Sequence, residues 1–392
     1  MPKAGAPTGA RYATTINKGV WIAMKGMLIA LAVAGLVRAA GAEEVPAKVA
    51  PEMPANPVRV DSNGTVYVPA MSIPVSEYLS SEGKAYLAEH LNLMQHPEML
   101  VQPNGIPPFL AGYLDRQRVL FPVNREEATV GGVHAYIYTP KTGVAAKNAK
   151  RVLIDLHGGG FHECWPACAE LESIPISSLG QIKVVSLDYR QGPKYEFPAA
   201  SEDVAAAYKE LLKTYRPENI GIYGCSAGGM LTGMSVAWFQ KHGLPKPGAV
   251  GVLCAGMTMS AGFGGDANYI SMPAGEGRMA FVSPPPAPGD AKAPKGGLPY
   301  FAHADLNDPL VSPGVSLPVL AQFPPTLIIT GTRGFELSSA VYTHSRLVKA
   351  GADAELHVWE GLFHGFFYNP DVPESRDAYD VIVKFFDRHL GQ

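Results

Sequence analysis

One serine of the chain stands in a sequence that suits a catalytic nucleophile. Ser226 lies in the run GCSAG at 224–228, with an apolar stretch at 220–223 before it and a helical pattern at 227–242 after it. A G-x-S-x-G run between a strand and a helix forms a sharp turn that exposes the serine hydroxyl. The helix N-terminus also favours negative charge that develops beside this hydroxyl. We therefore expect Ser226 to be a nucleophile, and Cys225 to be a buried, small apolar residue.

A glycine-rich run and a late histidine could complete the chemistry of acyl transfer. Residues 157–161 read HGGGF after an apolar stretch at 152–156, about 70 residues ahead of Ser226. Acyl transfer needs donors for a developing oxyanion, and backbone N–H groups at glycines let a substrate approach them closely. His364, one of 11 histidines, follows the last strand pattern in a glycine-flanked loop. A serine hydroxyl needs such a base, and the chain order serine, acid, histidine accompanies this type of turn.

These motifs together resemble the hormone-sensitive-lipase-like family of α/β-hydrolases, which is family IV among bacterial esterases, over roughly residues 115–390. Order and spacing agree with that family in HGGGF at 157–161, DYR at 188–190, FPAA at 197–200, Asp203, GCSAGG at 224–229, DP at 308–309, SP at 312–313 and GLFHGF at 361–366. The resemblance implies that the N–H groups of Gly159, Gly160 and Ala227 form the oxyanion hole. It also implies that His157 mainly braces its loop. The family often has Asp or Glu at the position of Cys225, a departure that leaves the expected chemistry intact.

The acid of the catalytic triad departs from the family pattern. The family's Asp follows the strand that corresponds to 326–330, and this chain has Gly334 there. Glu336, two residues on and one methylene longer, is the acid we expect to orient His364. Alternatively, Glu336 caps the helix that begins near residue 337, because acids are favoured in a first helical turn. Asp308 reads as a structural turn, and Glu360 belongs to the end of a strand.

Strand and helix patterns alternate along most of the chain. We expect strands at 118–123, 133–138, 152–156, 182–187, 220–223, 250–254, 326–330 and 354–359, and helices at 75–95, 200–215, 227–242, 337–349 and 376–390. This alternation predicts a mostly parallel sheet with helices on both faces, and an active site at the carboxyl ends of its strands. The expected fold is the α/β-hydrolase fold, with a catalytic domain over 116–392. Two irregular pieces, the N-terminal lead-in and cap segment at 43–115 and an insertion at 255–305, are expected to form a lid.

The N-terminus has the pattern of a secretory signal peptide. An 11-residue apolar run at 27–37 follows Lys25 and precedes the small-residue site Ala40-Gly41-Ala42. The run is too short to span a bilayer, so we expect cleavage after Ala42 and a secreted or periplasmic protein without stable membrane insertion. Residues 1–42 carry five basic side chains and no acid, which leaves the remainder with a net charge of −8. An acidic body without a basic run argues against nucleic acid as a partner.

Two cysteines follow the glycine-rich run. Cys164 and Cys168, with His162, form H-x-C-x3-C. In a secreted protein these cysteines can form a local disulfide that fixes shape beside the site more than it stabilises the fold. Free thiols and, with a fourth ligand missing, a zinc site are the alternatives. Cys254 ends an apolar strand and is expected to be buried.

The function expected from these residues is hydrolysis of carboxylic esters, with a preference for short acyl chains implied by the resemblance. Ser226 would form the acyl-enzyme and His364 would act as its base. No metal or organic cofactor is expected; the partner is a small-molecule ester, and a homodimer is left open. Two rivals remain: an amide deacetylase or lyase on the same scaffold, and a non-catalytic ligand-binding member of the family. The presence of Ser226 and His364 argues against the non-catalytic binding protein, whereas the absence of the family's Asp at Gly334 weakly favours it.

Overall fold

The structure is a computed structural model that describes residues 58–69, 72–96, 106, 108–258, 265 and 298–391. The chain divides into two compact units, Met1–Met71 and Ser72–Gln392. Within the described part of the first unit, β1 (Arg59–Val60) and β2 (Val66–Tyr67) pair as an antiparallel ribbon. The predicted signal peptide and most of the predicted insertion at 255–305 lie outside the described residues. Among the helices that are described, none is long and apolar enough to cross a membrane.

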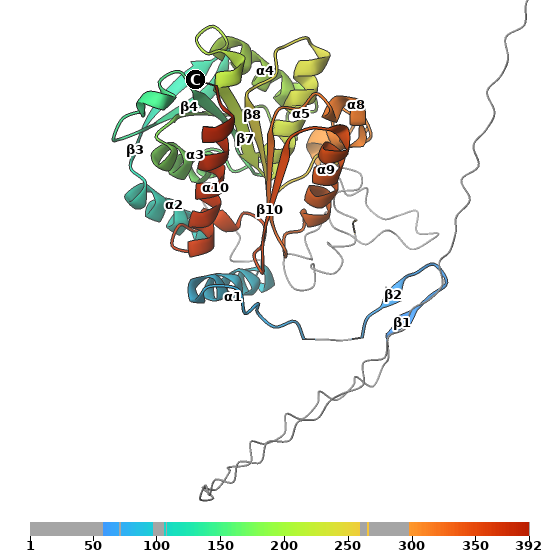
Figure 1. The fold of residues 1–392 in the computed structure, drawn as a ribbon. Coiled ribbons are helices and arrows are strands. Elements are labelled where there is room, and N and C mark those ends of the chain that lie inside the picture. Colours follow the sequence, from blue (N-terminus) through green and yellow to red (C-terminus); the bar gives the residue numbers. More distant parts are fainter. Residues whose placement is uncertain are drawn as a thin grey trace, which may run out of the picture. The chain divides into compact units, whose positions relative to one another are not determined.

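An eight-stranded sheet forms the centre of the second unit (Figure 1). In spatial order its strands are β10 (Ala354–Trp359), β9 (Thr326–Gly331), β8 (Ala249–Leu253), β7 (Ile220–Cys225), β5 (Val152–Leu156), β6 (Lys183–Leu187), β4 (Val133–Pro140) and β3 (Val123–Val130). β4 is antiparallel to both neighbours, and every other neighbouring pair is parallel. The central strands β5, β7, β8 and β9 are buried along their whole length, which is why each reads as a continuous apolar run. The predicted α/β-hydrolase sheet is confirmed.

Helices cover both faces of this sheet and enclose two apolar cores (Figure 1). One face carries α3 (Ala167–Gly180) and α10 (Pro373–His389), which pack against each other. The other face carries α4 (Ala199–Leu211), α5 (Ala227–Lys241), the short α8 (Leu317–Leu320) and α9 (Leu337–Ala350). Because β5, β7, β8, β9 and β10 are parallel, their carboxyl ends lie at one edge of the sheet. The loops that follow these ends, together with the first turn of α5, carry every site residue proposed from the sequence.

Among the described residues of the second unit, two α-helices precede the sheet, and one of them contradicts a predicted strand. α1 (Ser81–Gln95) confirms the predicted N-terminal helix, and its His90 stacks on Phe363 with ring centroids 3.6 Å apart. α2 (Pro108–Leu120) occupies part of the predicted strand 118–123, so that prediction is wrong. The segment forms a helix because Leu110, Leu114 and Gln117 recur at helical spacing and are all buried. α2 packs on α3, and it also runs across the predicted domain border at 115/116.

Candidate active site

The turn between β7 and α5 holds Ser226 in a strained conformation. Its φ of 58° and ψ of −120° are rare for a residue other than glycine, and such strain persists only where surrounding structure enforces it. A Cβ at Gly228 would lie 1.5 Å from the Leu156 carbonyl oxygen, and one at Gly224 would lie 2.1 Å from the same atom. Both glycines are therefore required by the close approach of β5. Cys225, directly before Ser226, is buried as expected.

The HGGGF run follows β5 and lies directly beside this turn. A Cβ on Gly158 would be 3.2 Å from the Cys225 carbonyl oxygen and 3.4 Å from the Ser226 Cβ. Gly159 and Gly160 adopt φ values of 116° and 62°, which glycine tolerates best. Among the described residues, no acceptor takes the backbone N–H of Gly159 or Gly160, and both glycines are partly exposed. Two free N–H donors thus lie on the loop next to the serine.

His157 is held inside the protein by contacts with its neighbours. Its Nδ1 lies 2.6 Å from the Gly158 carbonyl oxygen, so the ring donates a hydrogen bond there. The Tyr189 hydroxyl donates to the His157 carbonyl oxygen at 2.6 Å, and the two rings stack 4.6 Å apart. Burial lowers the pKa of His157 to about 4, because a charged imidazolium would lose its hydration. A neutral, packed ring agrees with a bracing role and not with proton transfer.

The disulfide that the cysteine spacing left open is present. Cys164 and Cys168 are bonded to each other, which contradicts the zinc alternative because both thiols are consumed. The loop that carries this disulfide touches the glycine run. The Gly159 carbonyl oxygen accepts the N–H groups of His162 and Glu163, and a Cβ on Gly159 would lie 2.8 Å from the Cys164 Cβ.

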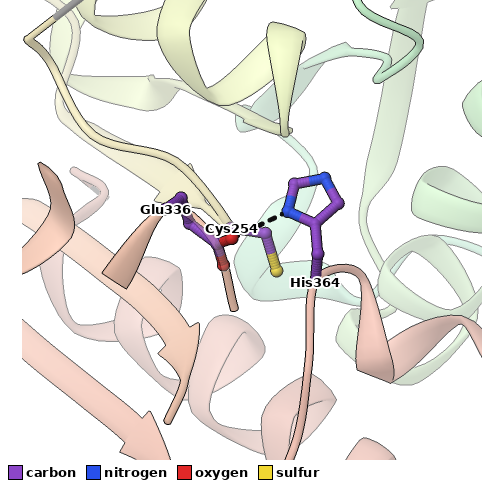
Figure 2. Close-up of side chains that lie close together, drawn as sticks. All are labelled: Cys254, Glu336 and His364. Carbon is purple, nitrogen blue, oxygen red and sulfur yellow. Dashed lines mark hydrogen bonds and ion pairs between the residues drawn. The ribbon is translucent and has the colours of Figure 1, made fainter. Parts of the chain in front are cut away.

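His364 and Glu336 form a partly buried pair (Figure 2). Nδ1 of His364 donates to Oε2 of Glu336 at 3.0 Å, and the Glu336 side chain is only 2% exposed. The second carboxylate oxygen, Oε1, accepts a 2.8 Å hydrogen bond from the Thr330 hydroxyl. Phe335 packs over the imidazole with ring centroids 4.3 Å apart. The pair leaves Nε2 of His364 as the ring atom that can exchange a proton with a partner.

The carboxylate of Glu336 occupies the space that a side chain at position 334 would fill. A Cβ built on Gly334 would lie 2.6 Å from Oε1 and 2.8 Å from Oε2 of Glu336. Glu336 is the N-cap residue of α9, yet its side chain makes no capping hydrogen bond there. The capping alternative is therefore wrong. Asp308 closes a turn through its bond with the N–H of Leu310, and Glu360 is exposed, so neither takes the place of Glu336.

The serine, the histidine and the glutamate meet in one cavity. Ser226, His364 and Glu336 line it together with Met230, Cys254, Ala255, Gly256, Thr258, Phe335 and Ser339. The thiol of Cys254 accepts the N–H of Gly365 at 3.3 Å and so anchors the loop that carries His364. Cys254, Glu336 and His364 offer atoms within 4.8 Å of one another (Figure 2), but the Nδ1 of His364 is already bound to Glu336. The arrangement suits a serine triad better than a metal site.

One acid beside this site was missed by the sequence analysis. Glu172, on α3, is buried and bonded to the loops described above. Its helix was not predicted because it is apolar on nearly all sides and contains Pro175, so no amphipathic period stands out. A usable signal was nevertheless present, because Glu170 and Glu172 stand in an apolar stretch that contains no basic residue. Acids in such a stretch are rarely buried without partners.

Comparisons with known proteins agree with this fold. A family model described as the alpha/beta hydrolase fold matches residues 153–368, more than half of the chain. An acetyl-hydrolase of Streptomyces hygroscopicus is 28% identical over 249 residues, which cover 63% of this chain and 79% of that protein. The carboxylesterase/phospholipase LipF of Mycobacterium tuberculosis is 32% identical over 250 residues, which cover 62% of this chain and only 63% of LipF. A crystal structure of an esterase from the bacterial hormone-sensitive lipase family superposes with a TM-score of 0.64 at 25% identity, covering 78% of this chain and 99% of that one. The chain belongs to the α/β-hydrolase family, in its hormone-sensitive-lipase-like branch of carboxylesterases.

Proposed function

We propose that this carboxylesterase works through an acyl-enzyme on Ser226. The Ser226 oxygen bonds to the ester carbonyl carbon while His364 takes the hydroxyl proton. The bond from that carbon to the alcohol oxygen then breaks, and His364 gives its proton to the leaving alcohol. A water molecule then bonds to the acyl carbon while His364 takes its proton. The bond from that carbon to the Ser226 oxygen breaks, His364 returns the proton to Ser226, and the carboxylic acid leaves. Glu336 holds the imidazole in the required tautomer and stabilises the imidazolium that forms.

The observation that carries this proposal is the hydrogen-bonded His364–Glu336 pair in the same cavity as the strained Ser226 turn. A carboxylate bonded to Nδ1 leaves Nε2 for the serine, which is the division of roles that a triad needs. The N–H groups of Gly159, Gly160 and Ala227 are proposed as the oxyanion donors. The free donors on the two glycines, and the position of Ala227 at the first turn of α5, support this assignment.

We expect substitution of the serine to separate catalysis from folding. Ser226→Ala should lower kcat by at least about 10³-fold, the scale of losing a triad member. Cys225→Ala, the adjacent control, should lose far less because its side chain is fully buried and is not among the residues that line the cavity. Turnover of a chromogenic acetyl ester and covalent labelling by an organophosphate measure both effects. Equal loss in a folded Cys225→Ala protein would show that the nucleophile is misassigned.

We further propose a preference for short acyl chains. The acetyl-hydrolase relative supports it by its name, and among the described residues Met230 and Phe335 line the cavity together with Ser226. A series of p-nitrophenyl esters graded from acetate to laurate measures the preference as kcat/KM. A maximum at acetate or butyrate is expected, and a maximum at long chains contradicts the proposal.

Secretion remains part of the proposal. The disulfide between Cys164 and Cys168 supports an oxidising compartment, where such bonds persist. N-terminal sequencing of the protein from its native host should find Glu43 as the first residue. A full-length chain recovered from the cytoplasm would contradict both the signal peptide and the compartment.

A further inference from the structure

A single buried carboxyl group links three loops of the active site. Glu172, 2% exposed, accepts the N–H of Gly158 at Oε1 over 2.9 Å and the N–H of Cys225 at Oε2 over 2.9 Å. The hydroxyl of Tyr368 lies 2.8 Å from Oε1. Each of the three partners is close in sequence to a group of the proposed mechanism. Gly158 precedes the oxyanion glycines, Cys225 precedes Ser226, and Tyr368 follows His364 in the short helix η7 (Phe366–Tyr368).

We infer that Glu172 is a positioning residue. Through these three hydrogen bonds it sets the distances between the oxyanion loop (158–160), the serine turn (225–226) and the histidine loop (364–368). This inference rests on the proposed function of those loops. Rate depends steeply on such distances, because a misplacement of about 1 Å can cost about 100-fold in turnover. A residue that touches none of the reacting atoms can therefore control kcat.

Burying the carboxyl group of Glu172 costs free energy that its hydrogen bonds must offset. Burial raises the pKa of Glu172 well above its ordinary value, and the neighbouring Asp155, also buried, adds to this effect. Within the described part of the chain, no lysine or arginine forms an ion pair with Glu172. A buried acid without a cationic partner is costly, whereas an apolar side chain of similar size would avoid that cost but would leave the N–H groups of Gly158 and Cys225 without this acceptor. What the acid adds is its set of links to the catalytic loops.

The three links need both oxygens of a carboxyl group but do not need its charge. When Glu172 is ionised, both oxygens accept N–H groups and the Tyr368 hydroxyl donates to Oε1. When it is protonated, Oε1 can donate to the Tyr368 oxygen while both N–H groups are still accepted. A glutamine has the same shape, but its NH2 group must face one of the two backbone N–H groups. Two donors then face each other, and one link is lost.

The chain offers a matched control on the same helix. Glu170, also buried, lies two residues before Glu172 and is bonded to Arg118 and Arg125, away from the catalytic loops. Glu170→Gln and Glu172→Gln therefore make the same chemical change at two buried acids of α3. Both substitutions should lower the melting temperature. Only the change at Glu172 should alter the geometry of the catalytic loops.

We expect Glu172→Gln to lower kcat for p-nitrophenyl acetate by roughly 10- to 100-fold while KM changes by less than about threefold. Glu172→Leu, which removes every link, should lose more. Tyr368→Phe breaks only the hydrogen bond to the loop that carries His364, so its kcat should fall by less. This variant still tests the inference if the Glu172 variants do not fold. Glu170→Gln should keep kcat within about threefold of wild type, since it removes no group near the site.

Hydrogen exchange measured by mass spectrometry tests the inference without relying on ester turnover. Glu172→Gln should raise exchange together in peptides that contain Gly158, Cys225 and Tyr368, and Glu170→Gln should not. Normal kcat and unchanged exchange in a folded Glu172→Gln protein would overturn the inference. A wild-type protein that neither turns over esters nor is labelled at Ser226 would instead refute the proposed function, and the exchange result would still decide the role of Glu172.

Discussion

If the proposed triad is correct, its acid should be movable from position 336 to position 334. A Cβ on Gly334 would overlap the Glu336 carboxylate, with 2.6 Å to Oε1 and 2.8 Å to Oε2. An aspartate introduced at 334 therefore extends into the space that the glutamate carboxylate now fills. A carboxylate at position 334, where the family has its acid, and the carboxylate of Glu336 would therefore occupy the same space beside Nδ1 of His364. We expect Glu336→Ala to inactivate the enzyme and a second change, Gly334→Asp, to restore part of its activity.

The magnitudes follow from the role of a triad acid. Loss of that acid costs roughly 10²- to 10⁴-fold in kcat, or about 3–5 kcal/mol of transition-state stabilisation. Gly334→Asp alone should also be harmful, because two carboxylates about 4 Å apart repel by about 4 kcal/mol at an effective dielectric constant of about 20. Protonation of one acid would reduce that figure. We expect the single variant to lose at least about 10-fold, and the double variant to regain at least about 10-fold over Glu336→Ala.

The assay is kcat for p-nitrophenyl acetate in four proteins, each with its melting temperature. The fourth is Gly334→Asn in the Glu336→Ala background, which has nearly the shape of aspartate without its charge. It should not restore activity, because an amide can select the wrong tautomer of His364. Glu336→Gln is a poor background for this test, since the glutamine side chain still fills the space at 334. Full activity in Glu336→Ala, or equal rescue by asparagine and aspartate, would refute the assignment of the acid.

Two further predictions concern the glycine run and its surroundings. Replacing Cys164 and Cys168 by serine should lower kcat roughly 3- to 30-fold, because the disulfide loop packs against Gly159. The same change should cost at most about 2 kcal/mol of unfolding free energy, since the closed loop is very short; unchanged turnover alongside normal folding would contradict the first expectation. The pKa of His157 is lowered to about 4 in the folded protein, so between pH 6.5 and pH 4 the unfolded chain binds a proton there that the folded protein does not. The contribution of His157 to the free energy of unfolding is therefore complete above pH 6.5, and about 3 kcal/mol of it is lost as the pH falls to 4. Melting temperatures of wild type and His157→Asn between pH 4 and 7 check this, and the wild type should show the steeper loss on acidification.

The parts of the fold that the sequence predicted well are those in which one physical requirement acts alone. Central strands are buried on both faces, so β5, β7, β8 and β9 appear as plain apolar runs. The α9 and α10 helices have one apolar face, so their periodicity is visible. α3 has no such face because it lies between the sheet, α2 and α10. The end of α2 was misread because its last turn, read alone, resembles a short apolar strand.

Within the candidate site, too, the residues that a local backbone requirement constrains could be located from the sequence, and the others could not. Turns that force a backbone into rare conformations require glycine at fixed spacing, so Ser226 and the glycines at 159 and 160 could be located from the sequence. The position of Glu336 could be proposed but not decided, because its role depends on where its carboxylate ends. A side chain that starts two residues late and is one methylene longer ends beside His364, and only the folded loop determines this.

Glu172 shows why a sequence motif identifies fewer residues than a site uses. A motif records residues whose backbone or chemistry is constrained locally, whereas the three bonds of Glu172 join segments separated by 14, 53 and 196 positions. No local pattern can encode such separations. The only local trace is a buried acid in an apolar helix, and the cost of burying it must be offset by partners elsewhere. In this fold, the useful question for each acid in an apolar helix is therefore which backbone N–H groups it binds. For Glu172 the answer is the N–H groups of Gly158, in the glycine run, and of Cys225, directly before Ser226.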